Sequence, residues 1–201
     1  MTSGMVKSEK TAQMAGTASE ILPEWHLDHL YPGMESTAYK ADLAAIEPLC
    51  RDFAERYRGK IVALAAGPDA ANRLYEAIRA YESIEDRLGR IISYAGLIYA
   101  GDTTDPARGK FYGDAQEKIT AASSELIFFQ LEINRIDDSR LAALATQPPL
   151  DHFAPWIDDI AKEKPYQLDD KLEQLFHEKS MTGRAAWNRL FDETIASLRF
   201  Q

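Results

Sequence analysis

The pair His177-Glu178 is the part of the sequence with the most definite chemical interpretation. In the motif H-E-x-x-H, two histidines on one helical face bind zinc and the glutamate acts as a general base. The position that needs the second histidine holds Met181, so the motif fails. We therefore expect His177 to be a partly buried, hydrogen-bonded residue, and we interpret His152, which stands alone before Phe153, in the same way.

A second candidate is the H-x-x-H pair of His26 and His29, which flank Asp28. Imidazole and carboxylate groups both bind zinc, so a metal site is one interpretation. However, the pair lies in the proline-flanked segment 23–33, and no third or fourth ligand is close in sequence. The preferred interpretation is a loop whose histidine and aromatic side chains fix the start of the chain on the fold.

Adjacent carboxylates could in principle perform acid–base chemistry, which needs two groups aimed at one substrate bond. Neighbouring residues on a helix do not face each other, so capping and solvation are the better interpretation of all such pairs. The pairs are Asp137-Asp138, Asp158-Asp159, Asp169-Asp170 and Asp192-Glu193.

Nucleophilic and nucleotide-binding motifs are absent from the sequence. It contains no G-x-S-x-G, no P-loop and no G-x-G-x-x-G, and Cys50 falls on a presumed core stripe. Trp25, Trp156 and Trp187 could line a peptide cleft, although burial is the more frequent fate of tryptophan in a helical protein. We therefore predict no catalytic, cofactor-binding or metal-binding residue in this chain.

The charge balance and the cysteine content exclude several classes of protein. There are 32 acidic against 23 basic residues, a net charge of −9, which disfavours nucleic acid and anionic membrane surfaces as partners. No apolar stretch approaches the roughly 20 residues that span a bilayer. The single cysteine and the lack of a signal-peptide pattern predict a cytoplasmic protein.

Any functional side chains must be positioned by helices, because apolar residues recur at intervals of three and four along most of the chain. Pro48 is expected to kink or split the first helix, and the stretch around Trp156 is expected to be irregular. The predicted helices cover residues 37–57, 67–100, 105–135, 138–145, 169–179 and 182–198.

No segment alternates as a strand does, and hydrophobic residues make up 45% of the chain. The predicted fold class is therefore all-α, an antiparallel bundle of long helices with a flexible N-terminal tail. Residues 1–22 are predicted to be a disordered tail because their apolar members are sparse and scattered, and residues 23–201 are predicted to form one helical domain.

Several segments resemble the N-terminal region of oligoendopeptidase F, a thimet-like (M3) family of zinc endopeptidases. The resemblance runs in order from about residue 23 to the end and rests on structural rather than catalytic motifs. The segments are WHLDHLYPG (25–33), RIISYA (90–95) with Asp102-Thr103, KPYQL (164–168), TGRAAWNRLFDE (182–193) and LRF (198–200).

The resemblance implies that this chain is the helical portion that forms one wall of a deep substrate channel. Family members are several times longer and carry H-E-x-x-H, with a downstream glutamate ligand, in a later domain. The implied partners are that catalytic C-terminal half and an oligopeptide substrate. The implied cofactor is zinc in the full-length enzyme, with none bound by this chain, which we expect to be a truncated and inactive piece.

Two other interpretations stay open. One is a free-standing helical binding or interaction module without catalytic activity, and the other is an unrelated enzyme whose site assembles from scattered residues. If a catalytic half is missing, some apolar surface should be bare, and we expect it around Trp187 and Phe191 on the last helix. A free-standing module should lack such a surface.

Overall fold

The computed structural model describes residues 25–199. All regular structure in this range is helical, which confirms the all-α prediction. The predicted tail, residues 1–22, lies outside the described range. In chain order the helices are α1 (Thr37–Tyr57), α2 (Ile61–Ala66), α3 (Ala70–Gly101), α4 (Pro106–Ser123), the 3-10 turn η1 (Ser124–Leu126), α5 (Ile127–Ile133), α6 (Asp138–Ala145), η2 (Leu150–Phe153), α7 (Ala154–Glu163), η3 (Lys164–Tyr166), α8 (Asp170–Lys179) and α9 (Arg184–Ser197).

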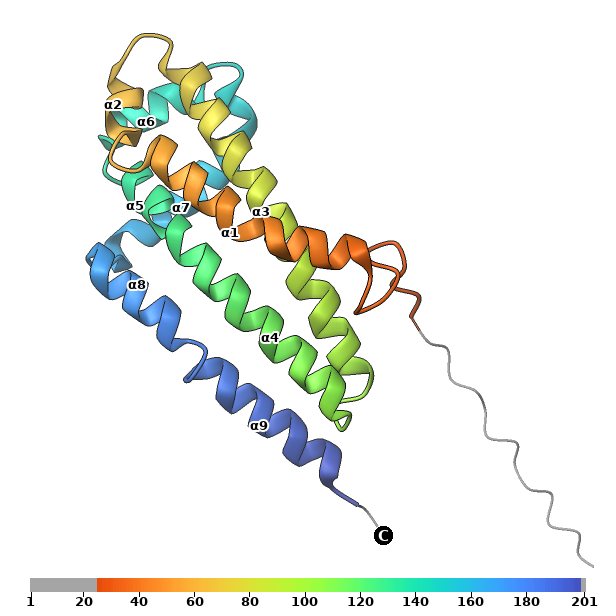
Figure 1. Ribbon diagram of the computed structural model, residues 1–201. Coiled ribbons are helices and arrows are strands. Elements are labelled where there is room, and N and C mark those ends of the chain that lie inside the picture. The colour runs from red at the N-terminus through yellow and green to blue at the C-terminus, as the bar shows by residue number, and fades with distance from the viewer. Residues whose placement is uncertain (1–24, 200–201) are drawn as a thin grey trace, which may run out of the picture.

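The hairpin of α3 and α4 forms the centre of the molecule, and its two helices run antiparallel side by side (Figure 1). The sharp turn between them is held by side chains. Asp102 Oδ1 accepts hydrogen bonds from the Thr104 backbone N–H at 2.9 Å and the Thr104 hydroxyl at 2.7 Å. Asp105 then caps α4 by accepting from the Ala107 N–H at 2.8 Å, and Pro106 occupies the first turn, where no N–H is needed.

Helix α1 packs against both helices of this hairpin and supplies much of the core. Ile46 and Cys50 are fully buried, and the Phe53 ring lies 5.1 Å from that of Phe129. The predicted splitting of α1 at Pro48 is wrong, because the helix continues from Thr37 to Tyr57. Pro48 points to solvent, while the buried residues on either side of it keep the two halves packed on one core.

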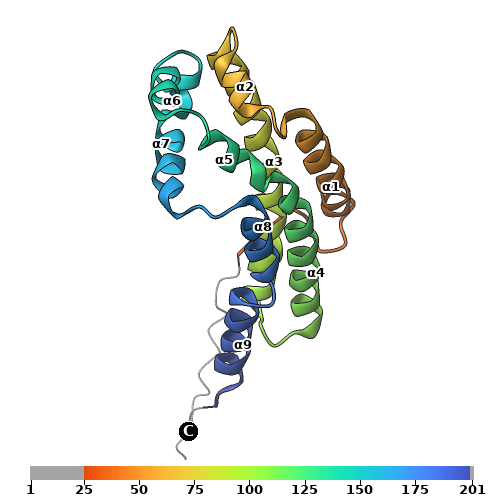
Figure 2. The same ribbon diagram turned by 90° about the vertical axis from the view of Figure 1, so that its left-hand side faces the viewer.

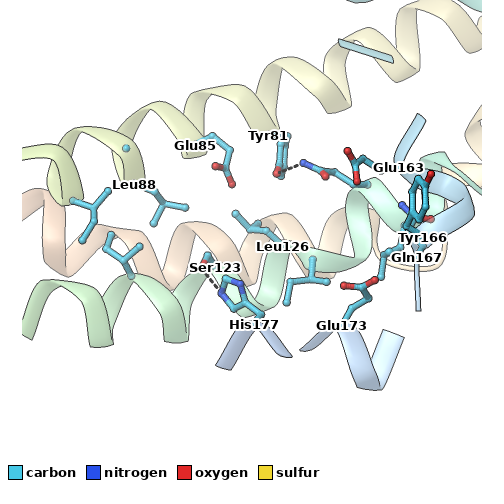
Figure 3. Close-up of a pocket in the computed structure, with 16 residues that line it drawn as sticks. Tyr81, Glu85, Leu88, Ser123, Leu126, Glu163, Tyr166, Gln167, Glu173 and His177 are labelled. Atoms are coloured by element: carbon cyan, nitrogen blue, oxygen red, sulfur yellow. Dashed lines mark hydrogen bonds between the residues drawn. The ribbon is translucent and has the colours of Figure 1, made fainter. Parts of the chain in front are cut away.

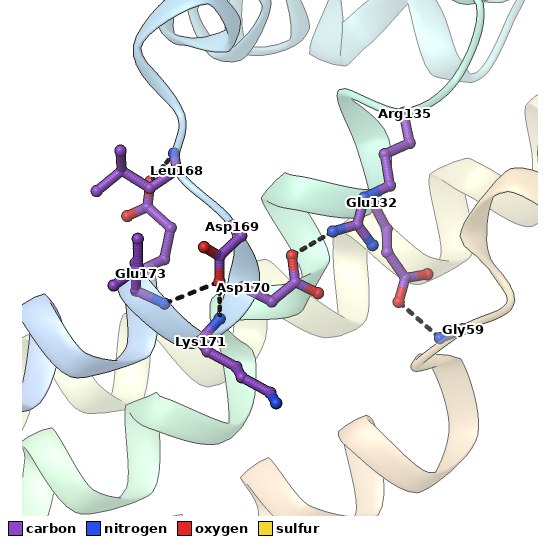
Figure 4. Close-up of polar contacts among 9 residues, drawn as sticks. Gly59, Glu132, Arg135, Leu168, Asp169, Asp170, Lys171 and Glu173 are labelled. Atoms are coloured by element: carbon purple, nitrogen blue, oxygen red, sulfur yellow. Dashed lines mark hydrogen bonds and ion pairs between the residues drawn. The ribbon is translucent and has the colours of Figure 1, made fainter.

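Shorter helices α2, α5, α6 and α7 gather around the N-terminal half of α3 (Figure 1). Glu132 of α5 fastens this group to the end of α1, although it is a carboxylate with only 5% exposure. Its Oε1 accepts the Gly59 N–H at 2.6 Å (Figure 4). Its Oε2 accepts the Ile61 N–H at 3.2 Å, where α2 begins. Gly59 has φ +77°, a conformation that costs glycine little, and this lets the chain turn here.

The second half of the chain departs from the predicted bundle of long helices. The expected helix 105–135 is interrupted by η1, because the hydroxyls of Ser123 and Ser124 both donate to the Thr120 carbonyl and compete with helical hydrogen bonds. The irregular stretch expected around Trp156 is instead helix α7. Helix α2 was not predicted, because its six residues are too few to show a period.

Helices α8 and α9 follow one another along the side of the α3–α4 hairpin (Figures 1 and 2). Helix α8 is anchored at its start by an ion pair between Asp170 and Arg135 of the core (Figure 4). Asp169 caps α8 by accepting the N–H groups of Lys171 and Leu172. Helix α9 approaches α3 and α4 only sparsely, and no residue of either α8 or α9 is buried.

Among the described residues, no helix is both long and apolar enough to cross a membrane.

Candidate functional site

An open groove of about 620 Å³ lies between α3 and α8 (Figure 3). We call it the α3–α8 groove. Its floor is apolar and comes from α3, α4, η1 and α5, and its rim carries polar and aromatic side chains from α3, α7, η3 and α8. The floor residues are Leu88, Ile92, Ile119, Leu126, Ile127 and Leu131.

Carboxylates dominate the charge of this groove. Glu85 of α3, Glu163 at the end of α7 and Glu173 of α8 line it, while no lysine or arginine does. Glu85 is exposed on its helix, yet surrounding protein atoms partly exclude water from its carboxyl group. This desolvation raises the pKa of Glu85, while the nearby Tyr81 hydroxyl and His177 lower it by smaller amounts.

Two further side chains fix the walls of the groove. Tyr81 accepts a hydrogen bond from the Gln130 amide at 3.0 Å, and burial together with Glu85 raises its pKa far above the ordinary value. His177 Nε2 is hydrogen-bonded to Ser123 Oγ at 2.9 Å and lies 3.3 Å from the Thr120 carbonyl oxygen. The expectation of a partly buried, hydrogen-bonded His177 is thereby confirmed, and its role here is to hold α8 against α4.

The other histidines lie apart from this groove. His26, His29 and Asp28 are exposed, and His29 Nδ1 lies 3.2 Å from the His26 carbonyl oxygen. The Arg90 guanidinium donates to the His29 carbonyl at 3.3 Å, which ties this loop to α3 as the loop interpretation requires. His152 was expected to be partly buried, and that is wrong: it is exposed, with its ring edge-on to Phe153 at 4.9 Å.

The adjacent carboxylates act as caps or as exposed partners of cations. Asp137 caps α6 through the Arg140 N–H at 3.0 Å, as Asp169 caps α8. Asp158 and Asp159 both pair with Lys162, at 2.7 and 3.0 Å. The remaining pair, Asp192-Glu193, is exposed on α9.

Cys50 is unsuited to nucleophilic chemistry. It is completely buried on the core face of α1, as its position in the apolar stripe predicts. Burial raises the pKa of the Cys50 thiol to about 12, so the thiolate is scarce at neutral pH.

The tryptophans divide between the core and the surface. Trp156 is half-buried, with its ring 6.1 Å from that of Tyr81. Trp25 and Trp187 are exposed, so the general expectation of burial is wrong for Trp25, while the exposure of Trp187 agrees with the bare apolar surface expected on the last helix. Trp187 instead belongs to a set of exposed apolar residues on α8 and α9, which we call the α8–α9 apolar surface: Leu172, Leu175, Phe176, Trp187, Leu190, Phe191, Ile195 and Leu198.

Helix α8 turns its polar side toward the rest of the chain, and α9 does so in part, because Phe191 and Ile195 also line a hollow beside Tyr99 and Tyr112. On α8, Asp170 pairs with Arg135 and His177 bonds Ser123, while Phe176 lies about 100° around the helix from His177. On α9, Arg189 lies beside Gly113 of α4, with Trp187 roughly 160° away around the helix. Surface helices normally bury their apolar stripe and solvate their polar face, so α8 is oriented the other way round, while α9 leaves most of its apolar stripe exposed.

Sequence reasoning missed the groove residues, although one signal was present. The apolar stripe of α3 passes through Ile78, Tyr81 and Leu88, and the position between the last two, one turn after Tyr81, holds Glu85. A carboxylate that interrupts a core stripe indicates a place where the helix faces a polar opening. Glu163 and Tyr166 gave no such signal, because they reach the groove only through the turn after α7.

No group of three or more histidine, cysteine, aspartate or glutamate side chains within residues 25–199 is placed to hold a metal ion. The carboxylates of the α3–α8 groove are thus spread along its rim rather than gathered on one point.

Comparison with known proteins finds a family resemblance in the C-terminal part of the chain. Residues 132–200, which run from α5 to the end of α9, match the model of the family described as Oligopeptidase F. Over this segment the chain therefore resembles the N-terminal region of oligoendopeptidase F, as the sequence motifs indicated.

The chain is also similar to Oligopeptidase PepF of Bacillus subtilis (strain 168), with 29% identity over 175 residues. The aligned part covers 86% of this chain but 25% of the relative, so the chain spans about a quarter of that protein's length. No solved structure matches the chain.

Proposed function

We propose that this chain is the N-terminal helical part of a zinc-dependent oligopeptide endopeptidase, in which peptide-bond hydrolysis is carried out by a catalytic portion outside the chain. Its contribution is to form one wall of the substrate channel and to present a docking surface to the catalytic portion. A cytoplasmic location remains the prediction of the sequence.

The observation that carries the proposal is the exposure of large apolar side chains along α8 and α9. Large apolar side chains such as Trp187, at 70% exposure, and Phe191, at 65%, are left mostly uncovered by residues 25–199. Monomeric proteins rarely leave such a surface in water. These helices lie inside the segment that matches the Oligopeptidase F family, and the chain spans only a quarter of PepF. The remaining part of such a peptidase is the natural cover.

The α3–α8 groove supports the second half of the proposal. An apolar floor with a polar rim, open along its length, suits an extended oligopeptide. A wall built from helices also favours flexible peptides, because a folded protein does not reach the floor of a narrow channel. The groove and the α8–α9 apolar surface share helix α8, so a catalytic portion docked on α8 would lie next to this groove.

Zinc belongs to the proposed enzyme through its family, and the residues present here do not fit it. The described side chains form no ligand set of three, and zinc hydrolysis needs about three protein ligands and an open position for water. We therefore assign no step of the hydrolysis to this chain.

The proposal is tested with a quenched fluorescent oligopeptide and the catalytic portion expressed separately. We expect no cleavage and no stoichiometric zinc for the purified chain alone, and cleavage when both parts are mixed. When the chain carries Trp187→Gln and Phe191→Gln, the restored cleavage activity should be at least about tenfold lower than with the parent chain. The reason is that central aromatic residues dominate interface energies.

The matched control is Val62→Gln, which changes an exposed apolar residue of α2 outside the α8–α9 apolar surface and should restore activity fully. One tight zinc per chain, together with chelator-sensitive cleavage by the chain alone, would overturn the proposal. A chain that has no effect on the catalytic portion would instead favour a free-standing binding module.

A further inference from the structure

The α3–α8 groove combines an apolar floor with carboxylates that lack a cationic partner. Within residues 25–199, neither Glu85 nor Glu163 takes part in an ion pair. Glu173 is partly committed, because its Oε1 accepts the Leu168 N–H at 2.8 Å. Surrounding protein atoms partly exclude water from the Glu85 carboxyl group, and a cation beside it would stabilise its charged form.

We propose that this groove binds an arginine or lysine side chain of an oligopeptide, with Glu85 as the main carboxylate partner and Glu163 as the second. The inference rests on the proposed function and narrows it, because it assigns a preference for basic peptides to the wall that this chain forms.

The shape of the site favours an organic cation over a metal ion. The three carboxylates come from α3, α7 and α8, and no three ligands converge on a point. A long basic side chain fits this arrangement, because its methylene stem can lie on Leu88 and Leu126 while its charged end reaches the rim. A volume of about 620 Å³ admits such a side chain and the neighbouring peptide backbone.

Aromatic residues at the rim fit the same ligand. Tyr166, at 79% exposure, lines the groove on the side of Glu163, and Tyr81 lines it beside Glu85 (Figure 3). Guanidinium and ammonium groups are attracted to the faces of aromatic rings. Within residues 25–199 the ring of Tyr166 is mostly uncovered, so a peptide side chain can lie against it without displacing core residues.

Binding is measured by fluorescence anisotropy with the full 201-residue chain and two labelled peptides that differ at one central position. One carries arginine and the other citrulline, which has nearly the same shape and no charge. We expect the arginine peptide to bind at least about tenfold more tightly, since a hydrogen bond to a charged group exceeds a neutral one by roughly this factor. Raising the salt concentration should weaken the arginine peptide more than the citrulline peptide.

Glu85→Gln should reduce the affinity for the arginine peptide about tenfold and leave the citrulline peptide unchanged. The matched control is Asp86→Asn, which removes the same charge from the neighbouring, exposed position of α3 outside the groove lining. Glu163→Gln supplies an independent variant on a different helix and should also weaken the arginine peptide. Circular dichroism shows whether each variant is folded.

Equal affinity for the two peptides, no binding of either, or equal effects of Glu85→Gln and Asp86→Asn would overturn the inference. None of these results bears on docking of the catalytic portion, which is read out by restored cleavage with the Trp187 and Phe191 variant. Conversely, failure of docking would leave a measured preference for arginine intact, so the two proposals fail separately.

Discussion

Helices α3 and α9 both carry apolar residues at helical spacing, but the apolar stripe of α3 is buried and that of α9 is largely exposed. On α3, Leu74, Leu88 and Ile91 are at most 4% exposed and form the middle of the core. On α9, Trp187 and Phe191 occupy equivalent stripe positions and remain mostly exposed. A periodic apolar stripe shows that a helix has an apolar face that favours burial. Only the tertiary structure shows whether residues of the same chain bury that face.

The difference divides the described chain into two regions. The core of α1 to α7 is held by buried aromatic and aliphatic side chains and by polar groups such as Glu132 that satisfy backbone N–H groups. The region of α8 and α9 is held by surface contacts, chiefly the Asp170–Arg135 pair and the His177–Ser123 hydrogen bond. Such contacts are individually weak, so local opening of α8 and α9 should require far less free energy than unfolding of the core.

The largest expected contrast is between core and surface aromatic truncations. Phe129→Ala should lower the free energy of unfolding by about 3–5 kcal/mol, because it leaves a cavity among the rings of Phe53, Tyr81 and Phe128. Trp187→Ala should change it by no more than about 0.5 kcal/mol, since an exposed ring leaves no cavity. Urea unfolding followed by circular dichroism measures both, and comparable losses would remove the distinction between the two regions.

A smaller effect is expected from the buried carboxylate of the core. Glu132→Ala should cost about 1–3 kcal/mol, because the N–H groups of Gly59 and Ile61 lose their acceptors near the start of α2. Glu132→Gln keeps one acceptor oxygen and should cost less. The same urea titration applies, and an alanine variant as stable as the parent would show that water replaces this carboxylate without loss.

The smallest effect concerns Glu85 in the groove and has a definite sign with pH. Desolvation raises the folded-state pKa of Glu85 above its ordinary value of 4.5, so its contribution to stability is present at low pH and is lost as pH rises through the folded-state pKa. Glu85→Gln removes that loss and should be slightly more stable than the parent at neutral pH. Thermal unfolding of the parent and of Glu85→Gln from pH 4 to pH 8 tests this, and identical pH profiles would contradict it.

Sequence patterns predicted the bounds of a helix well where a capping residue and a regular apolar stripe occur together. Helices 37–57 and 138–145 have the predicted bounds, because each begins after a capping side chain, Ser36 or Asp137, and carries a regular stripe. The break at η1 escaped prediction, since Ser123 and Ser124 look ordinary until their hydroxyls are seen on the Thr120 carbonyl.

The candidate site was less predictable than the fold. The exposed surface around Trp187 and Phe191 followed from the family resemblance rather than from periodicity, which does not reveal the direction in which a stripe points. The α3–α8 groove depends on residues more than 70 positions apart, such as Glu85 and Glu163, that only the tertiary fold brings to one rim. No local pattern encodes that proximity.

The most direct test of the central claim is whether the α8–α9 apolar surface of the isolated chain is available for contact. The measurement is fluorescence of a hydrophobic dye together with sedimentation velocity, on the parent chain and on the variant with Trp187→Gln and Phe191→Gln. We predict dye binding or self-association by the parent, loss of both in the double variant, and parent-like behaviour of Val62→Gln. A parent chain that stays a monodisperse monomer and gives no dye response would contradict the account.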